Sequence, residues 1–176
     1  MIKRIIIKFL LSIIIFTGSP ITSNTAASES LNNQNNPANI SKKPTKNSIQ
    51  QIALNKFNKA EKLEKKNKLS KAKKLYQDAL EDFHNANKND PFNPEILNYL
   101  GLIYQKLNRL TDAEIYYIIG LEISPKNFKI NENLGRLYVM ENKINLAKER
   151  LESLRDCNCE EFNRLEKKLI ENKIQN

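Results

Sequence analysis

Two cysteines, Cys157 and Cys159, are the residues of this 176-residue chain whose type and spacing could do chemistry. Thiols one residue apart can form a disulfide with each other, pair between chains, or act in thiol exchange or soft-metal binding. No histidine or further cysteine stands beside them, so the metal signal is weak and we expect no metal. Their position between two expected helices favours a structural role, with thiol-redox or metal handling as the alternative.

The other polar residues form no recognisable catalytic set. His84 is the only histidine, and we expect an ordinary surface side chain on a charged helix. A catalytic triad or a zinc site built on histidine needs more partners. The chain has 4 glycines and no glycine-rich phosphate loop, and its carboxylates are scattered along helix faces. The sequence therefore predicts no enzyme and no cofactor.

The N-terminal residues 1–27 have the order of a secretory signal peptide. Basic residues come first, an apolar run ends at Phe16, and small polar residues follow. The run is shorter than the roughly 20 residues of a membrane span, so we expect cleavage after Ala27 and export to the bacterial periplasm. An uncleaved anchor in the inner membrane is the alternative. Export also argues against a nucleic-acid partner.

The segment that follows, residues 28–48, is rich in Asn, Ser, Thr, Lys and Pro, and we expect a disordered linker. The net charge of +9 is concentrated just beyond it, because Lys42–Lys74 holds twelve lysines against Glu61 and Glu64. Such a segment could contact an anionic membrane or an acidic partner. We favour a plain solvated helix face, since Lys, Asn and Ile are overused along the whole chain.

Three similar short segments recur, and they begin at Asn67, Asn108 and Asn142. Asparagine readily adopts the left-handed conformation that ends a helix. The residue three positions on can cap the next helix through its side chain; these residues are Ser70, Thr111 and Asn145. The apolar residue between should pack the turn onto the core; these residues are Leu69, Leu110 and Ile144. Each segment is therefore predicted to be a tight turn between antiparallel helices.

Small residues, which let paired helices approach closely, stand at matching places around each turn. The pattern resembles the tetratricopeptide repeat family and is clearest in the second copy, with its Leu-Gly pair, Tyr, Ala, aromatic and Pro. The predicted repeat core is Ala60, Leu63, Ala72, Tyr76, Leu97, Leu100, Gly101, Tyr104, Ala113, Tyr117, Pro125, Leu134, Gly135, Tyr138 and Ala147. In the third copy, Asn131 stands where a large apolar residue is expected.

The predicted fold is an all-α right-handed solenoid of about three helical hairpins plus a C-terminal capping helix. Residues 49–90 form a degenerate first repeat, residues 94–127 and 128–159 form two further repeats, and residues 160–174 form the cap. The first repeat is seven residues longer than the 34 of the family. Seven residues are about two helical turns, so its second helix should be extended and end near Asn89.

The resemblance implies a groove lined by the first helix of each repeat. Its expected lining is Phe57, Glu61, Glu64, Glu95, Asn98, Leu102, Gln105, Lys129, Glu132, Arg136 and Val139. Many family members clamp a peptide carboxylate with Lys, Arg and Asn side chains, but Phe57, Glu61 and Leu102 stand at those places here, so we do not expect that ligand. The predicted function is a periplasmic scaffold that binds a peptide segment or a partner protein. A thiol or metal factor using Cys157 and Cys159, or a basic membrane-surface adaptor, is the alternative.

Overall fold

The computed structural model of the chain describes residues 46–175, and the side chains of residues 48–174. The predicted signal peptide and almost all of the predicted linker lie outside these residues. The described part contains no strand. Its helices are α1 (Lys46–Lys65), α2 (Leu69–Asn89), α3 (Pro94–Lys106), α4 (Leu110–Ile123), α5 (Phe128–Met140), α6 (Ile144–Glu152), the short 3-10 helix η1 (Arg155–Cys157) and α7 (Glu160–Gln175). The first helix thus begins three residues before the expected start at Ile49.

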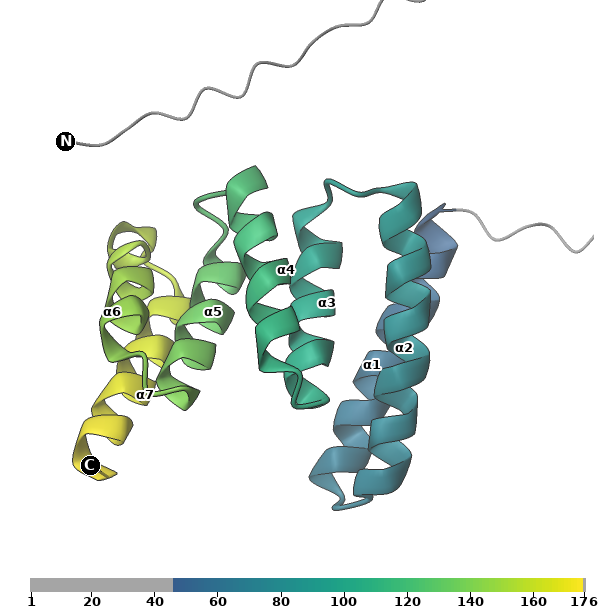
Figure 1. The fold of residues 1–176 in the computed structure, drawn as a ribbon, viewed down its shortest axis with the longest axis horizontal. Helices are drawn as coiled ribbons and strands as arrows, with labels where there is room; N and C mark the ends of the chain where they lie inside the picture. Colours follow the sequence, from purple (N-terminus) through teal and green to yellow (C-terminus); the bar gives the residue numbers. More distant parts are fainter. Residues whose placement is uncertain (1–45, 176) are drawn as a thin grey trace, which may run out of the picture. The chain divides into compact units, whose positions relative to one another are not determined.

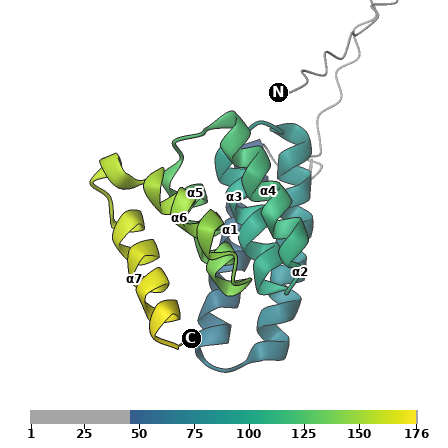
Figure 2. The ribbon, with the colours of Figure 1, turned by 60° about the vertical axis from the view of Figure 1, so that its left-hand side comes forward.

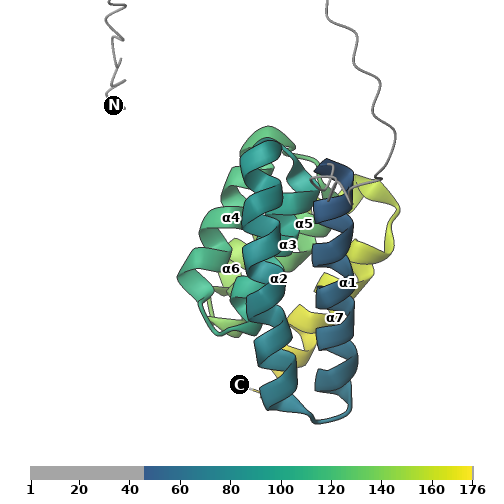
Figure 3. The same ribbon diagram turned by 90° about the vertical axis from the view of Figure 1, so that its right-hand side faces the viewer.

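Consecutive helices pair as antiparallel hairpins, α1 with α2, α3 with α4 and α5 with α6, and the hairpins stack in chain order (Figure 1). Viewed end-on, α2, α4 and α6 form one layer, and α1, α3, α5 and α7 form the other (Figure 3). The last helix, α7, packs on α5 and α6 at the C-terminal end of the stack (Figure 2). This arrangement is the predicted all-α solenoid. None of the helices in residues 46–175 is long and apolar enough to cross a membrane.

The turns within the hairpins confirm the prediction for the three asparagines. Asn67, Asn108 and Asn142 have φ angles of 55°, 60° and 57°. The residue after each asparagine donates its backbone N–H to the carbonyl five residues earlier, as Arg109 does to Tyr104 at 2.9 Å. This bond closes the end of the first helix.

The predicted capping residues, in contrast, do not cap. The second helices begin at Leu69, Leu110 and Ile144, so Ser70, Thr111 and Asn145 already lie inside the first helical turn. The residues at the capping positions make no side-chain capping bond. Side-chain caps are found instead between hairpins, where Asn93 accepts the N–H of Glu95 at 2.9 Å and Asn127 accepts that of Ile130 at 3.1 Å. A longer connection gives the asparagine side chain room to turn back onto the helix end.

The predicted core is buried at most of its positions, as the helix pairing requires. Ala60, Ala113 and Ala147 have no exposed surface, and Ala72 is 2% exposed. Leu63 is only half-buried. Pro125 is exposed, so its assignment to the core is wrong. It lies in the connection before α5, and its carbonyl oxygen accepts a 3.0 Å hydrogen bond from the side chain of Asn131.

Other apolar positions also depart from expectation. Leu69, expected to pack its turn, is 59% exposed, whereas Leu110 and Ile144 are half-buried. Asn131, at a position where an apolar residue was expected, is fully buried. Its side-chain nitrogen donates hydrogen bonds to the backbone carbonyls of Pro125 and Asn127, both at 3.0 Å.

The extended second helix of the first repeat ends at Asn89, as the seven extra residues predict. Its added turns carry Phe83, which is fully buried. The ring of Phe83 stacks on that of Tyr99 of α3, with centroids 5.1 Å apart. The extension therefore enlarges the contact between the first and second hairpins.

Candidate protein-binding groove

The layer formed by α1, α3, α5 and α7 holds the residues expected to line a groove. Three of them occupy equivalent repeat positions, namely Phe57, Asn98 and Glu132. They are 4%, 6% and 4% exposed, so the prediction that they face outward is wrong. Each is covered by the next helix of its own layer, because these helices lie side by side and hide the flanks that face one another.

The first two of these residues contact their neighbours through different chemistry. The ring of Phe57 packs edge-on against Tyr99 of α3, with centroids 5.3 Å apart. One step along the stack, Asn133 of α5 donates its side-chain amide to the Asn98 oxygen at 2.8 Å. Tyr99 and Asn133 are 34 residues apart, so they also occupy equivalent positions. The same geometry is therefore filled by an aromatic pair and then by an amide pair.

The third contact is an ion pair that holds the capping helix. Arg164 of α7 donates through Nε and a terminal nitrogen to the two carboxylate oxygens of Glu132, at 2.8 and 2.6 Å. Such two-pronged pairs have a fixed geometry. Arg136 approaches the same carboxylate at 3.5 Å. The Glu132 carboxylate is buried, and these guanidinium groups offset the cost of removing its charge from water.

A second set of predicted groove residues faces the other way. Glu64 and Gln105 accept hydrogen bonds from the hydroxyls of Tyr76 and Tyr117, at 2.7 and 3.2 Å. These bonds tie the first helix of a hairpin to its second helix. Burial opposes ionisation of Glu64, but hydrogen bonds from Lys106 and Tyr76 outweigh it and hold the pKa of this carboxyl below its usual range. Val139, at the equivalent place in the third repeat, is buried and only 3% exposed.

The remaining predicted residues are open to solvent to different degrees. Glu95, Lys129 and Arg136 are exposed, whereas Glu61 and Leu102 are half-buried. Of the predicted set, the structure brings Glu95, Asn98 and Lys129 together around one cavity of about 370 Å³. This cavity is the candidate groove, and it opens between α3, α5 and α7.

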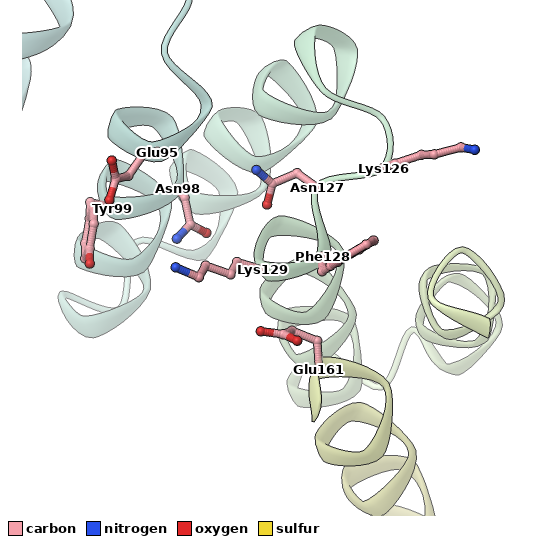
Figure 4. A pocket seen from close by; sticks show the side chains of 8 residues that line it. All are labelled: Glu95, Asn98, Tyr99, Lys126, Asn127, Phe128, Lys129 and Glu161. Atoms are coloured by element: carbon pink, nitrogen blue, oxygen red, sulfur yellow. The ribbon is translucent and has the colours of Figure 1, made fainter. Parts of the chain in front are cut away.

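Five further residues, which the sequence did not predict, also line the candidate groove. They are Tyr99, Lys126, Asn127, Phe128 and Glu161. In Figure 4, Lys129 extends from α5 toward Asn98 and Tyr99 on α3. Phe128 adds an apolar surface at the start of α5 and is 42% exposed. The sequence offered one signal for Phe128, because it is an aromatic residue directly after an asparagine that can cap a helix. No signal placed Glu161 there, because α7 contributes it by packing back onto α5.

The charged residues that line the candidate groove, two lysines and two glutamates, balance in number but do not pair with one another. Glu161 forms an ion pair with Arg164 at 3.2 Å, and Glu95 accepts a hydrogen bond from Gln50 at 3.1 Å. Within the described part of the chain, Lys126 and Lys129 have no such partner. Two free ammonium groups beside an exposed aromatic ring can receive an acidic or carbonyl-rich segment that also carries an apolar side chain.

His84 is not the surface residue that the sequence suggested. Its Nε2 lies 2.8 Å from the hydroxyl oxygen of Tyr104, and its ring packs edge-on against Tyr104 and Tyr116, both at 5.9 Å. Burial, with the nearby charges of Lys88 and Arg109, lowers the pKa of His84 below its ordinary value. His84 lies four residues after Leu80 and therefore on the same face of α2.

Cys157 and Cys159 are bonded to each other, which is one of the alternatives that the sequence left open. The disulfide lies between η1 and α7 and packs beside Phe162 against the C-terminal part of the core. Asn158 between the cysteines has a φ of 47°. Within residues 46–175, no group of three or more His, Cys, Asp and Glu residues could hold a metal ion.

The fold is supported by its similarity to the solved structure of a secretion chaperone. No protein-family model matches the sequence, and no curated protein matches it. The type III secretion translocator chaperone SycD of Yersinia enterocolitica is similar in structure, with a TM-score of 0.60 and 16% identity over 78% of this chain and 98% of SycD. The first TPR domain of Spaghetti (RPAP3), solved with an HSP90 peptide, has a TM-score of 0.45 and 24% identity over 68% of this chain and 91% of that one. The first TPR domain of human RPAP3 has a TM-score of 0.45 and 20% identity over 72% of this chain and 99% of that one.

Proposed function

We propose that this chain, which has the tetratricopeptide-repeat fold, is an exported scaffold that binds a peptide segment or partner protein in the periplasm. The observation that carries the proposal is the candidate groove of about 370 Å³ between α3, α5 and α7. It offers a mixed surface of two aromatic rings, two lysines that have no ion-pair partner among residues 46–175, and several amide and carboxylate groups. Protein-binding surfaces commonly combine an apolar anchor site with polar groups around it.

The groove favours a segment with an acidic side chain next to an apolar one. Lys129 and Lys126 extend in opposite directions in Figure 4, so each would contact a different acidic or carbonyl group of the segment, and the apolar side chain would cover Phe128. Glu95 and Glu161 lie on the same surface and would disfavour a uniformly acidic segment by like-charge repulsion. The segment is therefore expected to be mixed in charge.

A crosslinking experiment tests the groove. A photoreactive amino acid is placed at Lys129 in one chain and, as a control, at Glu152 on the opposite layer in another. The partner captured from the envelope fraction only at Lys129 is purified, and its affinity is measured by calorimetry. The double variant Lys126→Glu, Lys129→Glu should weaken binding at least about tenfold. Lys148→Glu, which reverses an exposed charge on α6, should leave the affinity unchanged. Equal affinities for all three chains would reject the groove.

Export is tested separately by fractionating cells that express the full chain. Cleavage after Ala27 gives a periplasmic protein whose N-terminus is Ser28, which intact-mass measurement and N-terminal sequencing would detect. A chain that keeps Met1 and sediments with the membranes would support the anchored alternative instead.

A basic membrane-surface role is a second candidate, and one observation favours it. Exposed lysines cluster around the turn between α1 and α2, namely Lys62, Lys65, Lys66, Lys68, Lys71, Lys73 and Lys74. Lysines near an anionic surface contribute about 1 kcal/mol each. Sedimentation with anionic and neutral vesicles tests this role. Binding to anionic vesicles that weakens as salt is added supports it, and equal binding to both vesicle types contradicts it.

A further inference from the structure

The outer side of α4 carries a stripe of exposed isoleucines. Ile115, Ile118 and Ile119 are 49%, 40% and 36% exposed. Their spacing places them on one face of the helix. The core-facing side of α4 is filled by other residues, including the buried Ala113 and Tyr117. This helix is therefore apolar on both sides, whereas a helix at a protein surface normally has a polar outer face.

The repeat itself provides a control for this stripe. The equivalent positions on α2, 41 residues earlier, are polar: Lys74, Gln77 and Asp78. The equivalent positions on α6, 34 residues later, are also polar: Glu149, Glu152 and Ser153. Packing of the hairpins therefore does not require isoleucine at these places. The apolar stripe is a property of α4 alone among the three second helices.

The stripe borders a groove between α4 and α6, on the layer opposite the candidate groove. A cavity of about 280 Å³ lies there, with Ile118, Leu121 and Leu146 among its lining residues and Leu134 and Tyr138 of α5 beneath them. Leu146 of α6 is 38% exposed. We define the isoleucine surface as Ile115, Ile118, Ile119 and Leu146.

Acidic groups flank the isoleucine surface. Glu122 and Glu149 line the same cavity, and within the described residues neither carboxylate has an ion-pair partner. Arg150 also lines it and donates toward the Asn131 side chain at 3.4 Å, so the two carboxylates outnumber the single cation of the lining. An occupant of this groove would therefore meet an apolar floor with free negative charge at its edges.

We infer that the isoleucine surface binds an amphipathic helix of a partner protein, with an apolar stripe and flanking Lys or Arg side chains. An apolar helix face in a groove is a recurrent mode of recognition, and basic flanks would pair with Glu122 and Glu149. A second copy of this chain is a poorer occupant. A two-fold symmetric contact would bring both copies of these unpaired carboxylates onto one apolar patch. The surface is separate from the candidate groove, so the inference stands independently of the proposed function.

Two designed helical peptides test the inference against the purified full chain by fluorescence anisotropy. Both carry the same leucine stripe, one flanked by lysines and the other by glutamates. The lysine peptide should bind at least about tenfold more tightly. The double variant Ile115→Gln, Ile118→Gln should lose this binding, while Ile52→Gln, which changes an isoleucine of α1 that is 44% exposed, should keep it.

Charge reversal gives a second measurement that does not depend on the apolar residues. In the Glu122→Lys, Glu149→Lys variant, the preference should shift to the glutamate peptide. Lys126→Glu, Lys129→Glu should leave peptide binding unchanged, which separates this surface from the candidate groove. Equal affinity for the two peptides, or an unaffected isoleucine double variant, would overturn the inference. So would self-association of the chain that the same double variant abolishes, because it would assign the surface to a second copy.

Discussion

At the scale of single residues, the turn asparagines show what the repeat requires of the backbone. Asn67, Asn108 and Asn142 hold positive φ angles, a conformation that costs most L-residues roughly 1–2 kcal/mol. Asparagine tolerates it better, and glycine tolerates it without penalty. The recurrence of asparagine at these places therefore reflects a backbone need and not a shared surface chemistry.

Substitution of Asn108 tests this interpretation. Asn108→Ala should lower the free energy of unfolding by about 1 kcal/mol, because alanine pays the full cost of the left-handed conformation. Asn108→Gly should leave the free energy of unfolding unchanged or raise it. Urea unfolding followed by circular dichroism measures both. If the alanine and glycine variants were equally stable, the backbone explanation would be wrong.

Two helical glycines should respond in opposite ways to alanine. A Cβ at Gly101 would lie 2.7 Å from Cδ1 of Tyr117, whose ring is fully buried and cannot move aside. Gly101→Ala should therefore destabilise the chain by about 2 kcal/mol through overpacking. At Gly120 the nearest atom is the flexible end of Ile130, at 2.6 Å.

The better helix propensity of alanine, worth about 1 kcal/mol, should offset that contact, so Gly120→Ala should stay within about 1 kcal/mol of the natural chain. Thermal unfolding of both variants checks the contrast. An equal loss of stability at the two positions would contradict it.

Single residues also show which features of the fold could be predicted from the sequence and which could not. The left-handed asparagines and the small residues between paired helices follow from local rules, and the sequence was enough to find them. Phe57, Asn98 and Glu132 were misplaced because their burial depends on the next helix of the layer, whose contacting residues lie 32 or more positions away in the chain. His84 was misjudged for the same reason, since Tyr104 and Tyr116 that cover it belong to the second hairpin.

At the scale of elements, α7 behaves as the first helix of a fourth, incomplete repeat. Arg164 contacts Glu132 as Asn133 contacts Asn98, one helix earlier in the stack. The neighbouring Leu165 is fully buried and packs over Gly135, where an added Cβ would meet its Cδ1 at 2.9 Å. The helix therefore closes the open end of the stack, as the sequence analysis expected of a cap.

Removing the arginine should loosen this cap. Arg164→Ala leaves the buried Glu132 carboxylate with only Arg136 nearby, and we expect a loss of about 2 kcal/mol. This is less than the 3–5 kcal/mol of a fully buried pair, because Arg164 is partly exposed. Amide hydrogen exchange should rise in α7 more than in α3. The double variant Glu132→Gln, Arg164→Ala should recover part of the loss, and exchange that is unchanged in α7 would refute the capping role of the ion pair.

The disulfide between η1 and α7 is expected to act on the same element. The loop that it closes is short, so Cys157→Ser, Cys159→Ser should cost only about 1–2 kcal/mol. Partner binding in the candidate groove should persist, since the groove does not include the cysteines. Denaturant unfolding and calorimetry give the two values. Loss of partner binding in the double variant, without any loss of stability, would instead support the thiol-redox alternative.

At the scale of the whole described chain, His84 joins the first hairpin to the second. It belongs to α2, yet it contacts Tyr104 of α3 and Tyr116 of α4. Arg109 lies over the Tyr104 ring at 4.5 Å, so a cation already occupies this junction. A second positive charge on the imidazole would add repulsion and would have to be buried.

These contacts predict a pH dependence of stability with a definite sign. Burial, Lys88 and Arg109 lower the pKa of His84 below its ordinary 6.5 in the folded chain, so the unfolded chain takes up the proton first as the pH falls. The stability that neutral His84 contributes is therefore fully present above about pH 7 and is lost as the pH drops below about 6.5.

His84→Gln keeps a polar group at the junction but cannot titrate. Denaturant unfolding at a series of pH values should show a fall in stability below about pH 7 that is smaller in His84→Gln. Equal slopes for the two chains would mean that the junction between the hairpins does not sense the protonation of His84.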